Sequence, residues 1–190
     1  ATIFCFGITF ASLVIPVSVL IYWLIQGVNA GNTIMPIWGV AWNSFYVSSW
    51  AVIVIVTISF PIASLTARHG NNFVKAIEQL SYLGFALPGI VIGLSLVFFG
   101  IRLASSLYQT MFMLVLAYSI LFIAPAIGTL RASLLQMNPH LEEAARGLGA
   151  SPLRTLLKIT LPIIKPGVIA GASLIFVLAI KELPATLILS

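Results

Sequence analysis

A chain of 190 residues in which 61% of the side chains are hydrophobic and only 7% are charged cannot be an ordinary soluble domain, in which about a quarter of the residues are charged. Aspartate is absent, and the formal net charge of +5 comes from nine basic residues scattered between apolar stretches, which form no basic face for a nucleic acid. The composition therefore predicts an all-α integral membrane protein, because a helix satisfies its own backbone hydrogen bonds in lipid.

Five apolar stretches are long enough to cross a bilayer core of roughly 30 Å as helices. In chain order they cover residues 3–25, 45–67, 80–101, 110–130 and 167–189. We expect them to form one polytopic domain over residues 1–190. Because the chain starts without methionine and stops inside an apolar stretch, we also expect it to be truncated, with a sixth span missing.

The basic residues predict how the spans are oriented. Most of them fall in the two connections 67–79 and 131–165, namely Arg68, Lys75, Arg131, Arg146, Arg154, Lys158 and Lys165. Both connections are therefore expected to face the cytoplasm, together with the start of the chain, and the connections 26–43 and 102–109 to face outward. This pattern is typical of a multi-pass protein of the cytoplasmic membrane.

The connection 131–165 is predicted to contain two short helices. Asn138 is a helix cap followed by Pro139 at the first helical position, and Gly149 stands where that helix should stop, so the first helix covers residues 139–148. Ser151 and Pro152 repeat the cap and the proline, which predicts a second helix that ends before Pro162.

The first of these helices carries an apolar stripe at helical spacing, formed by Leu141, Ala144, Ala145 and Leu148. The alanines are small enough for another surface to approach closely. A helix lying on lipid headgroups is the alternative, but Glu142 and Glu143 would then face an anionic leaflet. The pattern favours a protein partner.

The spacing of residues in this connection resembles the EAA loop of ABC importer permeases. The pattern is Glu143-Ala144-Ala145, three residues, Gly149, nine residues, and then Ile159-Thr160-Leu161-Pro162. The resemblance implies a helical bundle of the type I ABC importer permease type. It also implies that the loop 139–162 docks on a separate ATP-binding subunit through Glu143, Ala144, Ala145, Gly149, Ile159, Leu161 and Pro162.

The same resemblance implies the partners of the chain. They are cytoplasmic ATP-binding subunits, a second permease half or subunit, an extracytoplasmic substrate-binding protein and the surrounding lipid, with no nucleic acid. The chain has no phosphate-binding loop, since none of its lysines follows a glycine. We therefore expect it not to be an enzyme and to hold no cofactor, with ATP and magnesium bound on the partner subunit.

A second stretch points to a branch of the family. Residues 181–189, Lys-Glu-Leu-Pro-Ala-Thr-Leu-Ile-Leu, resemble the corresponding span of ferric-iron importer permeases, and the chain as a whole is most similar to the second half of such a permease. The resemblance implies ferric iron as the substrate. Importers of thiamine, polyamines or sulfate in the same family share much of this pattern and remain alternatives.

Two charged residues lie inside the predicted fifth span. An ionised group at mid-bilayer costs roughly 2.5 to 3.5 kcal/mol, so such residues usually line a pathway or find a partner. Lys181, Glu182 and Pro184 are therefore candidates for the substrate pathway. The structural alternative is that Lys181 reaches the membrane surface while Glu182 pairs with another helix. Both interpretations are open at this stage.

Other functions fit the sequence less well. If the chain were an ATP-independent channel or secondary transporter, the two-helix loop would have no evident function. A membrane protease would need a base beside its serine, but both histidines, His69 and His140, lie in predicted connections. Ferric ion prefers hard oxygen ligands. The chain has four side-chain carboxylates, Glu78, Glu142, Glu143 and Glu182. Two of them, Glu142 and Glu143, lie in the loop, so we predict no metal site in this chain.

Overall fold

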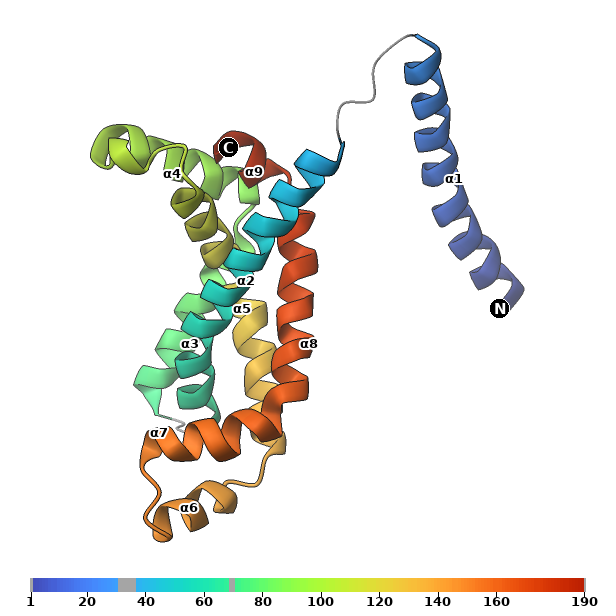
Figure 1. The fold of residues 1–190 in the computed structure, drawn as a ribbon. Helices are drawn as coiled ribbons and strands as arrows, with labels where there is room; N and C mark the ends of the chain where they lie inside the picture. The colour runs from blue at the N-terminus through green and yellow to red at the C-terminus, as the bar shows by residue number, and fades with distance from the viewer. Residues whose placement is uncertain (1, 31–36, 69–70, 190) are drawn as a thin grey trace. The chain divides into compact units, whose positions relative to one another are not determined.

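The computed structural model describes residues 2–30, 37–68 and 71–189, and in these ranges the chain is helical without strands (Figure 1). His69 lies outside them. The chain divides into two units, residues 1–42 and 43–190. The described residues contain four helices long and apolar enough to cross a membrane, or five if one bent pair counts as a single span. The all-α membrane fold expected from the sequence is thus confirmed.

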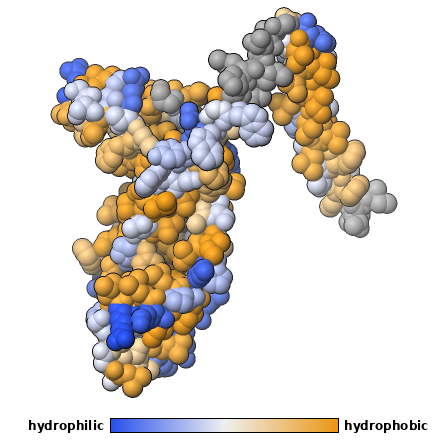
Figure 2. Space-filling view, in the orientation of Figure 1, coloured by the Kyte–Doolittle hydropathy of each residue, from blue (hydrophilic) through white to orange (hydrophobic). Residues whose placement is uncertain are grey.

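The first unit is built around helix α1, Thr2–Asn29, which covers the predicted first span. Its hydroxyl groups donate hydrogen bonds to carbonyls of the preceding turn, as Thr9 does to Cys5 at 2.9 Å and Ser18 to Ile15 at 2.8 Å. The hydroxyl groups therefore have hydrogen-bond partners within the helix and do not need water. Figure 2 shows apolar side chains over most of the visible face of each unit, as expected where lipid replaces water.

The second unit is centred on helix α5, Met111–Gln136, which packs along α8, Leu161–Ile180, and α3, Asn72–Ala86. Close approach of α5 and α8 depends on glycine. A Cβ atom at Gly167 would overlap Ser133 Oγ, and one at Gly171 would lie 2.6 Å from Thr129 Oγ1. Glycines at this spacing let membrane helices pack backbone to backbone.

Helix α2, Ile37–Arg68, contributes an inward stripe at spacings of three and four residues. Most of its members are small, and all are buried: Ser48, Ala51, Ile55, Ser59, Ala63 and Thr66. Ala51 and Ile55 join one core cluster with α4, Gly89–Leu103, and α5, while Ala63 joins a second cluster with the remainder of α5 and α8. The small residues permit this packing along the length of the helix.

The predicted third span, residues 80–101, falls on two helices in the structure. Helices α3 and α4 meet at a bend of 98°. The cause is Pro88, which lacks an N–H group and disfavours helical backbone at the residue before it. Leu87 is accordingly extended, with φ −87° and ψ 139°. After α4, a short 3-10 helix η1, Ser105–Leu107, leads into α5.

The predicted end of the second loop helix before Pro162 is wrong. Helix α7, Pro152–Thr155, continues through the π-helical turn η2, Leu156–Thr160, into α8, so that residues 152–180 form one helix. A proline ring clashes with the carbonyl four residues earlier, here Lys158, and the wider π turn makes room for it. The Leu161 N–H accordingly bonds the Leu156 carbonyl.

The predicted fifth span over residues 167–189 is wrong at both ends. It begins within the long helix described above, and it breaks after Ile180, before helix α9, Pro184–Leu189. Pro184 cannot continue the ladder of α8, and it stands instead as the first residue of the new helix. The loop is also shorter than predicted, since Arg131 lies in α5 and Lys165 in α8.

Candidate functional site

Helix α6, His140–Gly147, forms because its ends are capped as the sequence predicts. Asn138 Oδ1 accepts a hydrogen bond from the His140 N–H at 3.0 Å, and Pro139 already has helical backbone angles, φ −63° and ψ −26°. Asn138 therefore acts as the cap and Pro139 as the first helical residue. Both predictions are confirmed.

The end of α6 depends on Gly149. Its φ of +85° is in the left-handed region, which a glycine adopts without steric cost. The Gly149 N–H bonds the Arg146 carbonyl and the Ala150 N–H bonds the Ala145 carbonyl, both at 3.0 Å. This is the Schellman arrangement of a helix end. Ser151 then caps the next helix, since its Oγ accepts from the Arg154 N–H at 3.3 Å.

The apolar stripe predicted on α6 is divided in the structure. Ala145 is buried, on the side of α6 that meets α7 and η2. Ala144 is exposed, as are Leu141 at 46% and Leu148 at 90%. The prediction of one four-residue apolar face is therefore wrong, because a loop of two short helices must bury part of the stripe in its own packing.

The exposed part of α6 and its corner form a surface that we call the α6 face: Leu141, Glu143, Ala144, Leu148 and Gly149. Glu143 contacts only the His140 ring within the described residues, at 2.8 Å, and its side chain is 70% exposed. The other candidate docking residues lie elsewhere. Ile159 and Leu161 are half-buried on η2 and α8, where Leu161 packs against the core, and Pro162 is exposed.

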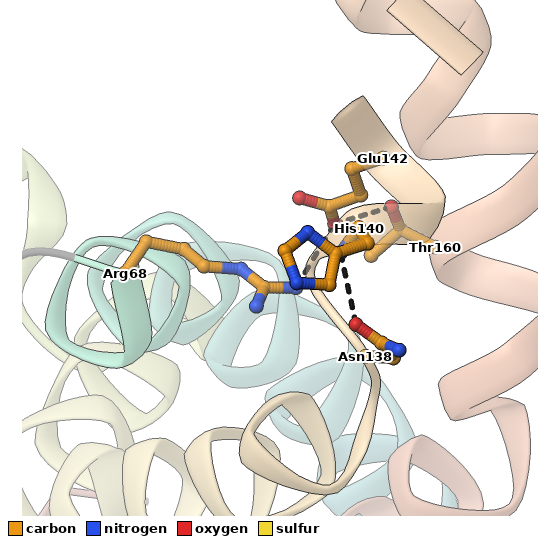
Figure 3. A network of polar contacts seen from close by, with 5 residues as sticks. All are labelled: Arg68, Asn138, His140, Glu142 and Thr160. Carbon is orange, nitrogen blue, oxygen red and sulfur yellow. Dashed lines mark hydrogen bonds and ion pairs between the residues drawn. The ribbon is translucent and has the colours of Figure 1, made fainter. Parts of the chain in front are cut away.

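Glu142, next to the α6 face, points inward and fastens the loop to the bundle (Figure 3). Its Oε1 lies 3.2 Å from Arg68 Nη2, at the end of α2, and accepts a hydrogen bond from Thr160 Oγ1 at 2.8 Å. The two charged side chains are only 20% and 17% exposed. Ion pairs shielded from water are screened less than surface ones. We call these three residues the loop clamp.

The same end of the bundle has a second tie. Arg131 Nη1 on α5 lies 3.8 Å from Glu78 Oε1 on α3, and its Nε lies 3.5 Å from the Thr66 carbonyl on α2. The Arg131 guanidinium therefore connects α5 with both α2 and α3. In the sequence, Arg68 and Arg131 indicate only membrane sidedness, because their partners in these ion pairs are distant along the chain.

The opposite end of the second unit contains the break between α8 and α9, beside α4 (Figure 1). Lys181 and Pro184 are exposed there, while Glu182 is half-buried. Glu182 borders a cavity of about 180 Å³, which we call the Glu182 cavity. It is lined by Asn43, Ser44, Val47, Ser48, Leu114, Tyr118, Ala179, Ile180, Glu182, Leu183 and Thr186.

The Glu182 carboxylate is held at the bend between α3 and α4. Its Oε1 accepts a hydrogen bond from the Ala185 N–H at 3.3 Å, and a Cβ atom at Gly89 would overlap the same oxygen. Gly89 is the first residue of α4, and Pro88 before it supplies no side-chain cap. The free N–H groups and the dipole of a helix start favour an anion. The bend therefore places the start of α4 beside the Glu182 carboxylate.

A chain of hydroxyl groups joins Glu182 to α5. Thr186 Oγ1 donates to the Glu182 carbonyl, and Tyr118 Oη lies 2.6 Å from Thr186 Oγ1. Because a threonine hydroxyl has a single proton, Tyr118 is the donor in the second bond. The Tyr118 oxygen thus keeps its acceptor lone pairs. No group of three or more His, Cys, Asp or Glu side chains that could hold a metal occurs in the described residues.

Comparison with known proteins gives consistent results. Residues 59–190 match the family described as binding-protein-dependent transport system inner membrane component. The chain is 39% identical over 181 residues to the Fe(3+)-transport system permease protein FbpB 2 of Haemophilus influenzae, covering 94% of the chain but only 36% of that relative.

Relatives named for other substrates are also similar. The molybdenum transport system permease protein ModB of Escherichia coli is 31% identical over 167 residues, covering 80% of the chain and 71% of the relative. A spermidine/putrescine transport system permease protein PotC homolog of Mycoplasma genitalium is 30% identical over 130 residues, covering 65% of the chain and 46% of the relative. The chain is thus similar to permease proteins named for ferric iron, molybdenum and spermidine/putrescine.

Proposed function

Because the chain belongs to the family of binding-protein-dependent transport system inner membrane components, the permeases of ABC importers, we propose that it forms part of the membrane pathway of an ATP-driven importer of ferric iron. In this proposal an extracytoplasmic binding protein delivers the substrate. ATP and magnesium bind to separate cytoplasmic subunits, and a second permease half completes the pathway.

The α6 face is the observation that carries the coupling part of this proposal. Leu141 and Ala144 are exposed on a helix of eight residues, and Leu148 is exposed directly after it; the helix is capped at both ends and held by the loop clamp. A rigid apolar surface of this kind fits a protein partner better than water. We propose that the ATP-binding subunit docks here, which places the loop and the start of the chain in the cytoplasm.

The continuity of the second loop helix suggests how movement of the loop reaches the pathway. Residues 152–180 form one helix of 29 residues, about 43 Å long at 1.5 Å per residue. Glu142 on α6 accepts a hydrogen bond from Thr160 within this helix and forms an ion pair with Arg68 at the end of α2. Displacement of α6 by ATP-driven closure would therefore shift two helices that border the Glu182 cavity, as alternating access requires.

Ferric iron is the substrate that we favour, on the basis of the identity to the Haemophilus relative. Thiamine, polyamine, sulfate and molybdate importers of the same family remain the alternatives. For the pathway we propose Glu182 as a lining residue. Lys181 and Pro184 flank it at the break, where Pro184 separates α9 from α8.

Co-purification tests the docking proposal. An ATP-binding subunit should remain with the wild-type complex and be lost from Glu143→Lys and Gly149→Asp, which place a charge on the α6 face. Ser106→Lys is the control, because Ser106 is exposed on η1, outside the loop. If the subunit stays bound in both loop variants, docking on α6 is wrong. If uptake continues without any ATP-binding subunit, the chain is a channel or secondary transporter.

A further inference from the structure

The loop and helix α2 face each other across a cavity of about 380 Å³. Helices α6, α7 and η2 border it with residues that include Glu142 and Thr160, and α2 borders it with Phe60, Pro61, Ser64 and Leu65. Walls that face each other across a cavity make no packing contacts. Helix α6 itself packs against α7 and η2. The ion pair of the loop clamp, between Arg68 and Glu142, therefore connects α6 directly to α2 at a place where packing does not.

This ion pair tolerates a change in the angle between its two helices. Arg68 Nη2 and Glu142 Oε1 are 3.2 Å apart, yet Nη2 is buried and forms no hydrogen bond within the described residues. The attraction therefore depends mainly on the distance between the charges, with which it changes slowly, and not on a hydrogen-bond angle. Helix α6 can thus rotate relative to α2 while the attraction persists.

Helix α2 is packed closely enough to pass a displacement on to the other end of the second unit. Ala51 and Ile55 of α2 are fully buried and join one core cluster with Ile92 on α4 and Ala185 on α9. Close-packed side chains leave few voids, so a shift of one helix displaces its neighbours. A displacement that starts at Arg68 therefore reaches α4 and α9, which lie at the end opposite the loop (Figure 1).

Glu142 and its neighbour Glu143 are oriented differently. The side chain of Glu143 is 70% exposed on the α6 face, whereas that of Glu142 is 17% exposed and meets Arg68. Consecutive residues of a helix point about 100° apart, since a turn has about 3.6 residues. One glutamate is thus available to a partner protein while the other holds the bundle.

We propose that Arg68 and Glu142 are positioning residues for energy coupling, which transmit the movement of α6 to α2, whereas the α6 face binds the ATP-binding subunit. Loss of the ion pair leaves the subunit bound but separates ATP hydrolysis from the membrane helices. This inference rests on the proposed importer function, which it deepens by assigning docking and transmission to different residues.

The importer's binding protein, purified with the ligand that it carries, is a suitable probe because it acts from the side of the membrane opposite the loop. Its stimulation of ATP hydrolysis by the complex in nanodiscs must pass through the membrane helices. We expect Glu142→Gln to lower this stimulation about fivefold or more, as for the loss of a typical coupling between two sites, while the ATP-binding subunit still co-purifies. Glutamine keeps an acceptor for Thr160 and removes only the charge. Unchanged stimulation, or loss of the subunit, would overturn the inference.

Two variants of Arg68 separate transmission from stability. Arg68→Gln should lose the stimulation as Glu142→Gln does, whereas Arg68→Lys keeps the charge and should stay within about twofold of wild type, because the contact depends on distance. A purely structural ion pair would lower the unfolding temperature of Arg68→Gln without changing the stimulation in the intact complex. That result, or equal losses from lysine and glutamine, would contradict transmission through the charge.

The matched control is the second tie at the same end of the bundle. Glu78→Gln removes a carboxylate that lies 3.8 Å from Arg131 and does not touch the loop, and we expect it to leave the stimulation within about twofold of wild type. If Glu78→Gln and Glu142→Gln lower the stimulation equally, the loop clamp has no particular role in coupling.

The wild-type complex separates this inference from the proposed function. If its ATP hydrolysis does not respond to the binding protein, the importer function is contradicted and the coupling role falls with it. If the wild type responds and Glu142→Gln responds equally, the importer function stands and the role of the clamp is wrong.

Discussion

Glu142 and Glu182 lie at opposite ends of the second unit, both partly buried, and the surroundings of their carboxylates differ. Glu142 at the loop end meets a full positive charge, Arg68, at 3.2 Å, together with the Thr160 hydroxyl. In the part of the chain that the structure describes, the Glu182 carboxylate at the other end accepts a hydrogen bond only from a backbone N–H and lies beside the start of α4. The Glu142 charge is therefore paired within the chain, whereas Glu182 forms no ion pair among the described residues.

Removing one partner of the loop clamp should give the largest effect. Arg68→Ala leaves Glu142 shielded from water and without its cation, which costs several kcal/mol for a fully buried pair and, with side chains about one-fifth exposed, about 2 to 3 kcal/mol here. Thermal unfolding of the complex in nanodiscs should show this loss, along with faster proteolysis of the loop. The double variant Arg68→Ala with Glu142→Ala should recover part of it, and an unchanged loss would show that the two charges do not interact.

Filling the space beside Glu182 should have the next largest effect. Gly89→Ala forces the Glu182 carboxylate to move, at an expected cost of about 1 to 3 kcal/mol in the free energy of unfolding. The matched control is Gly93→Ala on the same helix, whose Cβ would meet Ala185 and Ile188 at an ordinary 3.5 Å. That substitution should be neutral or stabilising by up to about 1 kcal/mol. Equal unfolding temperatures for the two variants would contradict this packing.

The corner of the loop gives a smaller effect. Gly149→Ala must adopt a φ of +85°, at a cost of about 1 to 2 kcal/mol. Gly147→Ala, inside α6 with open space around its Cβ position, should instead stabilise the helix by about 0.5 to 1 kcal/mol. Hydrogen exchange of the loop amides would measure both changes, and a change of the same sign in the two variants would exclude the left-handed turn at Gly149.

The smallest effect is expected at the tie between α3 and α5. Glu78→Gln weakens an ion pair of 3.8 Å whose arginine side chain is 40% exposed. Such pairs contribute about 0 to 1 kcal/mol. Unfolding temperatures should therefore differ little between this variant and wild type. A loss as large as that of Arg68→Ala would mean that the loop clamp is not special among the ion pairs of this end.

The features that could be predicted from the sequence are those that depend on residues close together along the chain. The caps at Asn138 and Ser151 and the stop at Gly149 follow from local hydrogen bonds and backbone angles, and the structure has all three. Length and hydropathy were enough to locate α1, α2 and α5.

The sequence could not predict features that depend on packing. Pro88 and Pro162 look alike in the sequence, yet the chain bends by 98° at the first and continues through a π turn at the second. Local rules state the cost of a proline but not how neighbouring helices accommodate it. The loop clamp and the neighbours of Glu182 were missed for the same reason, since Arg68, Gly89 and Tyr118 are distant from their partners in the chain.

Cross-linking from the α6 face tests the central claim most directly, namely that this face docks an ATP-binding subunit. In the complete importer with Cys5→Ser, which removes the single cysteine of these 190 residues, Ala144→Cys should cross-link to the ATP-binding subunit, with a yield that changes when ATP is added. Ser106→Cys on η1 should give no such product. Absence of the cross-link from Ala144→Cys, or an equal yield from both positions, would contradict docking on α6.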